Sequence, residues 1–132
     1  MKGKVFVVDW DIVAVEEHAK HLFDDGWDVQ YESVDGRRAF DLIKADHPDV
    51  VVIYLSAMPA YGRALADDMR SFKETSKLPI VFVDGKEKAV KKAMAEVPDC
   101  ICTTQEDVLG ELLRFRKTQR PRMSGFESDE SE

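Results

Sequence analysis

The chain has 132 residues, a formal net charge of −7 at pH 7 and 44% hydrophobic residues, which predicts one globular domain that buries a core without disulfides or metal. The excess of acidic residues disfavours nonspecific attraction to nucleic acid or to an anionic membrane. No stretch approaches the roughly 20 apolar residues of a membrane span and Met1-Lys2-Gly3-Lys4 lacks the features of a signal peptide, so we expect a cytoplasmic protein that does not contact membranes.

Strand and helix patterns alternate five times along residues 4–116. Short β-branched and aromatic runs predict strands, whereas apolar residues three and four apart predict helices. The predicted strands span residues 4–9, 28–33, 50–55, 79–83 and 100–103, and the predicted helices span residues 12–25, 35–46, 63–73, 86–97 and 106–116. Residues 56–62, which include Pro59 and Gly62, are a predicted loop.

The same spacing selects the side chains expected to face the core. In the first helix it places Leu22 and Phe23 inward, and in the fourth helix it places Met94 inward. The run 50–55 is apolar on both faces, as is typical of a central parallel strand. On the last strand, Cys100 and Cys102 form a C-x-C pair, which alone is neither a metal site nor a thioredoxin motif; we expect free thiols in a reducing compartment.

Strands separated by helices of this length predict right-handed crossovers and a parallel sheet. Five such units indicate an α/β fold, a flavodoxin-like three-layer sandwich with a five-stranded sheet of order 2-1-3-4-5 and five helices. Ligand chemistry in such sheets takes place at the carboxyl ends of the strands. In this chain Asp9, Tyr54, Asp84 and the pair Thr103-Thr104 follow or end the predicted strands.

The C-terminal part differs from the rest of the chain. We expect a folded domain over residues 1–117 and a flexible charged tail over residues 118–132, because the tail lacks apolar periodicity and contains Pro121. Five cations lie in residues 114–122, and an acidic segment follows. The cations could contact phosphates, but the acidic segment could pair with them instead, so we do not expect nucleic acid as a partner.

Several landmarks resemble the receiver domain of bacterial response regulators over about residues 3–115. They are Val7-Val8-Asp9-Trp10-Asp11, Pro48-Asp49 followed by four apolar residues, Met58-Pro59 followed by Gly62, Leu78-Pro79-Ile80-Val81-Phe82-Val83, and Pro98-Asp99-Cys100-Ile101. The resemblance implies the fold inferred above and a role in two-component signal transduction. It also implies a phosphorylation pocket at the carboxyl ends of the strands.

The residues that this family uses for phosphorylation are mostly replaced. The resemblance places Asp9 and Trp10 where two acids hold Mg²⁺, and Tyr54 where an aspartate accepts the phosphoryl group. Asp84 stands for the strand-four hydroxyl and Thr104 for the strand-five lysine, while Ile101 stands for the switch aromatic. These positions, with Asp11, define a degenerate pocket for which we expect neither a cofactor nor a metal.

Physical chemistry supports that expectation. Mg²⁺ prefers octahedral oxygen ligands with carboxylates among them, and Asp9 and Asp11 are weak candidates because Asp11 is better explained as a helix N-cap. Asp84 would repel an anion where the family has a hydroxyl. A neutral Tyr54 phenol could donate a hydrogen bond to Asp9 or Asp84. Trp10 is expected beside this pocket.

Two interpretations of Tyr54 remain open at this stage: a core aromatic whose hydroxyl is satisfied at the rim of the sheet, or a lock that holds one conformation. Three functions also compete. The first is a phosphorylation-independent module for protein interaction. The second is a working receiver that uses Asp11 or Asp84 as acceptor, and the third is a magnesium-dependent phosphatase resembling haloacid dehalogenases, suggested by Asp9-Trp10-Asp11.

The first function is favoured, and it predicts that the protein is not an enzyme. Its partner would be another protein, of a kind that the sequence does not name, or a second copy of the chain through the face formed by helix four, strand five and helix five. The candidate residues on that face are Lys88, Lys91, Lys92, Glu106 and Arg114. The competing explanation for this charge run is an ordinary solvated helix face.

Overall fold

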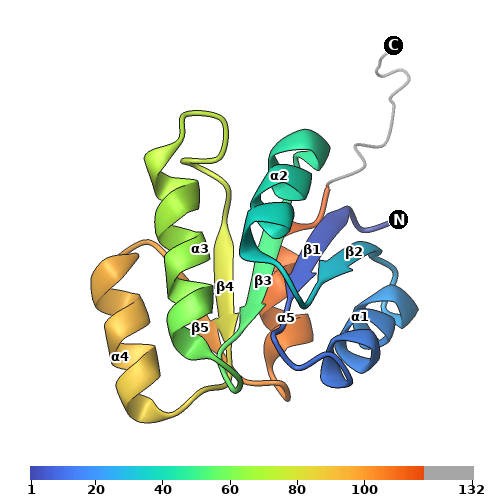
Figure 1. The fold of residues 1–132 in the computed structure, drawn as a ribbon. Coiled ribbons are helices and arrows are strands. Elements are labelled where there is room, and N and C mark those ends of the chain that lie inside the picture. The colour runs from blue at the N-terminus through green and yellow to red at the C-terminus, as the bar shows by residue number, and fades with distance from the viewer. Residues whose placement is uncertain (118–132) are drawn as a thin grey trace.

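The computed structural model describes residues 1–117 and contains a five-stranded parallel sheet covered by helices on both faces (Figure 1). The predicted flexible tail, residues 118–132, lies outside the described residues. Within the described part, no helix has the length and apolar character needed to cross a membrane.

The elements alternate strand and helix as predicted. The strands are β1 (Lys4–Val8), β2 (Asp28–Glu32), β3 (Val50–Tyr54), β4 (Ile80–Val83) and β5 (Ile101–Thr103). The helices are α1 (Ala14–Asp24), α2 (Gly36–Asp46), α3 (Pro59–Ser71), α4 (Glu87–Glu96) and α5 (Val108–Leu112), and a 3-10 turn over Leu113–Phe115 follows α5.

The strands pair in the order β2-β1-β3-β4-β5, and every pair is parallel. The predicted flavodoxin-like sandwich is therefore confirmed. The register places Tyr54 level with Val83 on β4, and Val83 level with Thr103 on β5. The carboxyl ends of the strands thus lie along one edge of the sheet, which we call the carboxyl edge.

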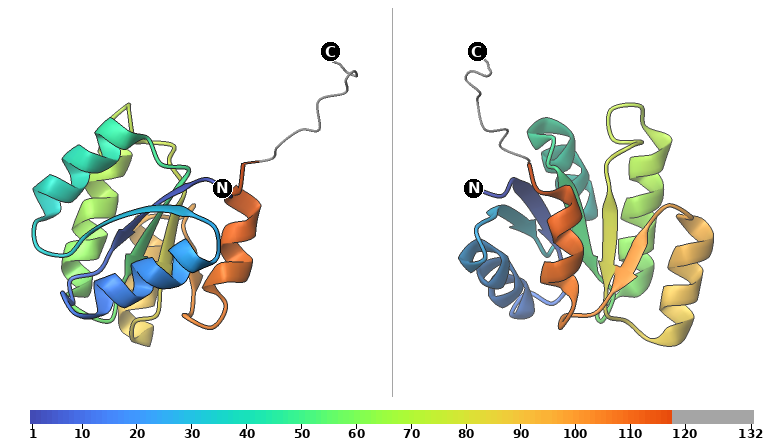
Figure 2. Two further views of the ribbon diagram at one scale, coloured as in Figure 1. Left: turned by 90° about the vertical axis from the view of Figure 1, so that its right-hand side faces the viewer. Right: turned by 180° about the vertical axis from the view of Figure 1, so that it is seen from behind.

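Helices cover both faces of the sheet (Figure 2), and an apolar layer lies between the sheet and the helices on each face. On one face, α2, α3 and α4 pack on alternate strand residues such as Phe6, Ile53 and Phe82. On the other face, α1 and α5 pack on the remaining residues, such as Val7 and Val52. Every residue of β3 and β4 is buried, whereas β2 contains only exposed and half-buried residues, in keeping with its place at the edge of the sheet.

The predicted loop over residues 56–62 is wrong, because α3 begins at Pro59. Met58 has a left-handed backbone with φ of 48°, and Pro59 follows as the first helical residue, a position that suits its fixed φ and missing N–H. Gly62 lies inside α3, where a side chain would clash, because a Cβ at this position would be 2.7 Å from the Cγ2 of Ile53. The glycine therefore allows α3 to pack closely on β3.

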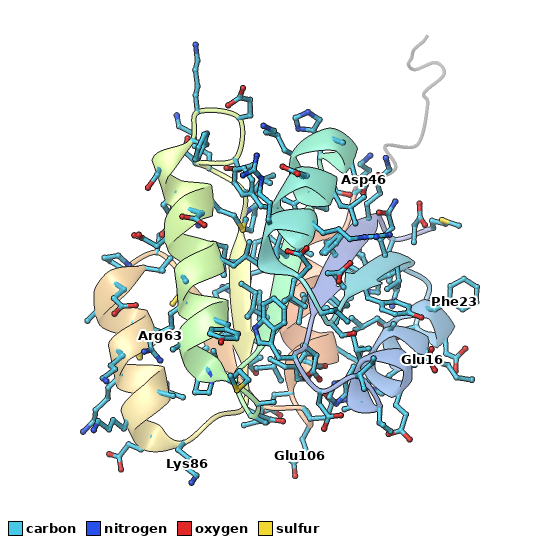
Figure 3. All side chains as sticks on the ribbon, in the orientation of Figure 1. Glu16, Phe23, Asp46, Arg63, Lys86 and Glu106 are labelled. Atoms are coloured by element: carbon cyan, nitrogen blue, oxygen red, sulfur yellow. The ribbon has the colours of Figure 1, made fainter. Side chains whose placement is uncertain are left out.

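Other local expectations also need correction. Phe23 and Met94 were expected in the core, but they are 61% and 54% exposed, and Figure 3 shows Phe23 at the outer side of α1. Phe23 lies one residue, and so about 100° around the helix, beyond the buried Leu22.

The last helix is shorter than predicted, because regular α-helix ends at Leu112 and a 3-10 turn continues the chain.

The two cysteines are free thiols, as predicted. Their sulfur atoms lie 3.8 Å apart at the β5 edge of the sheet. Burial, followed by the neighbouring Cys102, raises the pKa of Cys100 to about 12. Because the thiolate is the reactive form, a raised pKa lowers the reactivity that we expect of Cys100 at neutral pH.

Candidate functional site

Five polar side chains from five segments meet at the carboxyl edge. They are Asp9 after β1, His18 on α1, Tyr54 at the end of β3, Asp84 after β4 and Gln105 after β5. We call them the Tyr54 cluster. Its members lie on the face of the sheet that α1 and α5 cover, because Tyr54 belongs to the apolar layer beneath those helices.

Tyr54 is fully buried. Its ring lies 3.8 Å from the ring of His18, with only 3° between the two planes. Its hydroxyl donates a hydrogen bond of 2.7 Å to Oε1 of Gln105. The expectation that the phenol donates to Asp9 or Asp84 is therefore wrong: the acceptor is a neutral amide oxygen.

Asp9 is also buried, with 2% of its surface exposed. One carboxylate oxygen lies 2.8 Å from Nδ1 of His18, and the other accepts a 3.0 Å hydrogen bond from the backbone N–H of Asp11. These contacts satisfy both oxygens of a buried carboxylate, which would otherwise carry a large desolvation cost. His18 thus joins Asp9 to Tyr54, by a hydrogen bond on one side and by stacking on the other.

Asp11 occupies the position expected of a capping residue. Its Oδ1 accepts hydrogen bonds from the backbone N–H groups of Val13 and Ala14, at 3.0 and 3.1 Å. These N–H groups belong to the first turn that leads into α1, where no helical carbonyl is available to them. The side chain of Asp11 therefore organises the start of α1.

Asp84 is held by the loop that follows β5. Its Oδ1 accepts a 3.0 Å hydrogen bond from the backbone N–H of Gln105, and its own N–H donates to the carbonyl of Thr103 at 2.9 Å. The backbone of Asp84 is left-handed, with φ of 61°, a conformation that costs of order 1 kcal/mol in a residue other than glycine. The same loop therefore fixes both Asp84 and the amide that Tyr54 contacts.

The electrostatics of the cluster keep the phenol neutral. Burial, then the negative charges of Asp84 and Asp9, hold the pKa of Tyr54 well above its ordinary value. A neutral phenol can donate one hydrogen bond, and that bond is already made to Gln105. Among residues 1–117, no three His, Cys, Asp or Glu side chains are grouped so that they could hold a metal ion.

Trp10 does not lie beside this cluster, contrary to expectation. It points to the opposite face of the sheet, where it packs against the layer under α2 and α3 and meets Tyr61 edge-on at 5.9 Å. Its buried Nε1 has no hydrogen-bond partner among the described residues. The reason is strand alternation: Asp9 and Trp10 are neighbours after β1 and project to opposite sides.

Ile101 and Thr104 are also not in contact with the phenol hydroxyl. Ile101 is level with Val81, two residues below Val83, and packs in the apolar layer under α5. Thr104 is exposed, and its hydroxyl accepts a 3.3 Å hydrogen bond from the N–H of Asp107. The residue after β5 that reaches Tyr54 is Gln105.

Sequence reasoning missed two members of the cluster, His18 and Gln105. A signal for His18 was present, because it lies three residues after Val15 and four before Leu22, on the buried stripe of α1. No comparable signal marked Gln105, which lies in a turn whose direction depends on the path of the chain between β5 and α5.

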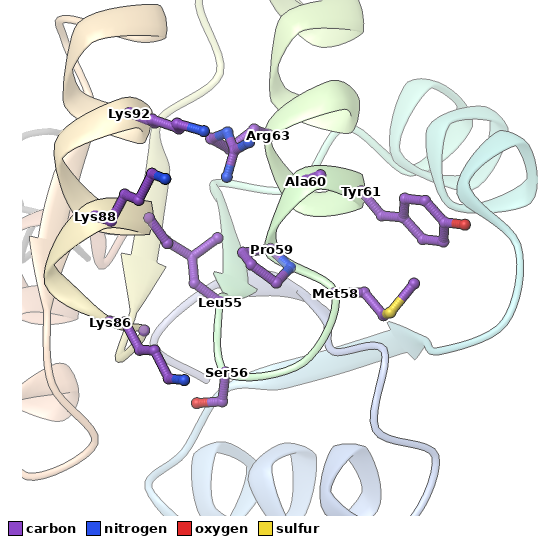
Figure 4. A pocket seen from close by; sticks show the side chains of 12 residues that line it. Leu55, Ser56, Met58, Pro59, Ala60, Tyr61, Arg63, Lys86, Lys88 and Lys92 are labelled. Carbon is purple, nitrogen blue, oxygen red and sulfur yellow. The ribbon is translucent and has the colours of Figure 1, made fainter.

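The five candidate interaction residues divide between two faces. Lys88 and Lys92 extend from α4 toward α3, into a groove between these helices (Figure 4). Lys91 pairs with Glu87 at 3.2 Å. On the other face, Arg114 pairs with Glu111 at 2.8 Å, and Glu106 is exposed in the turn before α5.

No protein-family model matches the chain, and no curated protein is similar to it in sequence. Solved structures of receiver proteins are similar in fold. The chemotaxis response regulator CheY4 of Vibrio cholerae is 21% identical, with a TM-score of 0.70, over 87% of this chain and 99% of that one. The signal receiver domain of NarL from Mycobacterium tuberculosis is 24% identical, with a TM-score of 0.61, over 86% of this chain and 91% of that one.

NtrX from Brucella abortus, solved in complex with ATP, is 19% identical, with a TM-score of 0.71 over 87% of this chain. The present chain spans only 27% of NtrX. At identities of 19–24%, these similarities establish a shared fold: the chain has the fold of response regulator receiver domains.

Proposed function

We propose that the chain is a pseudo-receiver: a receiver-like domain of bacterial two-component signalling that binds a protein partner without being phosphorylated. The observation that carries this proposal is the hydrogen bond from Tyr54 to Gln105. The donor of this bond is a neutral, fully buried phenol, and it stands at the position where the resemblance to receivers predicts an aspartate acceptor. A phenol there cannot form an acyl phosphate.

The surroundings of Tyr54 support the same proposal. A phosphoryl group brings two negative charges, and the cluster already holds the carboxylates of Asp9 and Asp84 near the phenol. Within residues 1–117, no lysine or arginine forms an ion pair with Asp9 or Asp84; the only such contact is that of His18 with Asp9. Transfer of a phosphoryl group needs such positive groups, or a metal, around the oxygens that gain charge.

The stacked and hydrogen-bonded arrangement also favours the hypothesis that Tyr54 locks one conformation. His18 on α1 and Gln105 before α5 contact opposite parts of the same side chain. A movement of either segment would break a contact with a buried group. We therefore infer that any signal depends on binding at the surface and not on a rearrangement of this edge.

A working receiver with a rearranged acceptor is the second candidate, because Asp84 is half-buried at the rim of the cluster. Its Oδ1 is engaged by the N–H of Gln105, whereas no hydrogen bond is recorded for its Oδ2 among residues 1–117. Asp11 is less suited, since its Oδ1 accepts two hydrogen bonds at the start of α1.

The test is to incubate the full chain with Mg²⁺ and acetyl phosphate and to measure its intact mass, with CheY4 of Vibrio cholerae as a comparison. We expect no added phosphoryl group on this chain. Phosphorylation that is lost in Asp84→Asn would establish the second candidate and overturn the proposal.

A second measurement tests the interaction itself. The full chain is used to capture partners from native lysate, and the Lys91→Ala/Arg114→Ala variant serves as the matched bait. We expect a partner that the wild-type chain retains with or without acetyl phosphate and that the variant releases. A partner that binds only after treatment with acetyl phosphate would contradict independence from phosphorylation.

A further inference from the structure

The groove between α3 and α4 differs in character from the rest of the carboxyl edge. It has a volume of about 770 Å³ and opens between the first turns of the two helices (Figure 4). Leu55, Pro59 and Ala89 supply apolar walls. We call this surface the α3–α4 groove.

Four cations line the groove: Arg63, Lys86, Lys88 and Lys92. Within residues 1–117, none of the three lysines has a carboxylate oxygen within ion-pair distance. Arg63 is the exception, since its Nε lies 3.3 Å from Oε1 of Glu96. The contact does not have the geometry of a hydrogen bond, and this buried Nε has no hydrogen-bond partner among the described residues. A chain of net charge −7 thus concentrates unneutralised positive charge in one hollow.

Backbone dipoles add to this field. α3 has 13 residues and α4 has 10, and both begin at the groove, at Pro59 and Glu87. The N-terminal end of a helix carries a partial positive charge. Low-dielectric walls around charges of one sign focus their potential, so an anionic group that also carries an apolar side chain would fit both components of the groove.

We propose that the α3–α4 groove binds residues 126–132 of this chain. That segment, Phe126-Glu127-Ser128-Asp129-Glu130-Ser131-Glu132, contains one aromatic residue followed by four carboxylates. It lies outside the described residues, and its chemistry complements the groove in both respects. The aromatic ring would lie on the apolar walls, and the carboxylates would pair with the lysines and Arg63.

The basic stretch 114–122 is the competing binding site for these carboxylates. Its member Arg114 is already paired with Glu111. The groove, in addition to its cations, offers apolar walls for the ring of Phe126. A site that binds charge and ring together loses the electrostatic part of its affinity when salt screens the charges and keeps only the smaller apolar part.

The segment can come from the same copy or from a second one. Lys117 donates its N–H to the carbonyl of Lys2, before β1 begins, and thus at the edge opposite to the groove. The nine residues 118–126 span at most about 30 Å when fully extended. Dependence of groove occupancy on protein concentration separates these two arrangements.

Occupation of the groove would cover Lys88 and Lys92, which belong to the candidate interaction face. The segment would then compete with a partner that uses these lysines. The inference does not rest on the proposed function, because it concerns contacts of the chain with itself and is measured without any partner.

The experiment compares amide spectra of the ¹⁵N-labelled full chain with those of a Glu127→Gln/Asp129→Asn/Glu130→Gln/Glu132→Gln variant. We expect resonances of Lys86, Lys88 and Lys92 to differ between the two proteins at low salt. In 1 M salt, where the Debye length is about 3 Å, the wild-type spectrum should move toward that of the variant. Phe126→Ala should produce a part of the same shift.

The matched control neutralises four exposed acids elsewhere, in Glu17→Gln/Asp28→Asn/Asp67→Asn/Glu74→Gln. It changes the net charge by the same amount and should leave the groove resonances in place. Shifts confined to residues 114–117 would assign the acidic segment to the basic stretch and overturn the proposal. Groove resonances that are identical in wild type and tail variant would overturn it as well.

A second arm measures binding between separate molecules. A fluorescent peptide with the sequence of residues 126–132 is titrated into the tail variant of the full chain. We expect saturable binding that Lys88→Ala/Lys92→Ala weakens about tenfold, which corresponds to two partly screened ion pairs of roughly 0.7 kcal/mol each. Equal affinity for both proteins would show that the peptide does not bind in the groove.

Discussion

Tyr54 and Leu55 are adjacent in sequence, yet they belong to two different regions of the carboxyl edge. Tyr54 points under α1 and α5, into a cluster where its hydroxyl donates to Gln105 and where His18 is hydrogen bonded to Asp9. Leu55 points under α3 and forms a wall of an open groove whose lysines have no carboxylate partners within residues 1–117. Strand alternation alone separates the two environments.

From the difference between these regions we infer that binding takes place at the groove. The phenol, Asp9 and one oxygen of Asp84 in the Tyr54 cluster are already hydrogen bonded, so we expect the cluster to contribute to stability and to have little capacity left for a ligand. The three lysines of the α3–α4 groove have no carboxylate partner within residues 1–117, so we expect them to contribute little to stability and to remain available for binding. Substitutions on the two sides of the strand should therefore have opposite consequences, which the following predictions test.

Tyr54→Ala should produce the largest effect. The phenol ring is fully buried and packs against His18, and truncation of a buried aromatic costs about 3–5 kcal/mol in the free energy of unfolding. Urea denaturation of the variant and of the wild-type chain measures this difference. Tyr54→Phe is the control: it keeps the ring and loses only the bond to Gln105, at a cost of about 1 kcal/mol. Equal losses in the two variants would mean that packing around the ring is not the main contribution.

Alkaline pH should weaken the cluster next most strongly. An unfolded tyrosine ionises near pH 10, whereas burial and the nearby carboxylates hold the pKa of Tyr54 above that value in the folded protein. The contribution of Tyr54 to stability is therefore complete below about pH 10 and decreases as the pH rises further, because the unfolded state releases the proton first. Urea denaturation between pH 8 and pH 11, roughly the range around the pKa of an unfolded tyrosine, measures the effect. The free energy of unfolding should fall more steeply with pH for wild type than for Tyr54→Phe.

Substitution in the groove should have the smallest effect on stability. Lys88 and Lys92 are exposed and lack carboxylate partners within residues 1–117, so Lys88→Ala/Lys92→Ala should change the free energy of unfolding by no more than about 0.5 kcal/mol. Thermal denaturation provides the measurement. A loss comparable with that of Tyr54→Ala would show that the groove is part of the structural core and would remove the contrast between the two regions.

Much of this architecture could be predicted from the sequence. Alternating strand and helix patterns predict a parallel sheet of order 2-1-3-4-5, and the ends of the strands place Asp9, Tyr54 and Asp84 at one edge. The spacing of buried residues on α1 also contains the information that His18 faces the sheet. These features depend on local periodicity and on the handedness of crossovers, which short segments of sequence carry.

The partners of these side chains required the tertiary structure. Trp10 and Tyr54 both lie at strand ends in the sequence, but one packs under α2 and α3 and the other under α1 and α5. Gln105 reaches Tyr54, and Thr104 does not, because the turn after β5 directs one side chain inward and the next outward. The groove arises only when α3 and α4, which are separate in sequence, lie side by side. Sequence thus determined the fold and the edge at which chemistry is concentrated, while long-range packing decided which charges are neutralised and which remain available to bind.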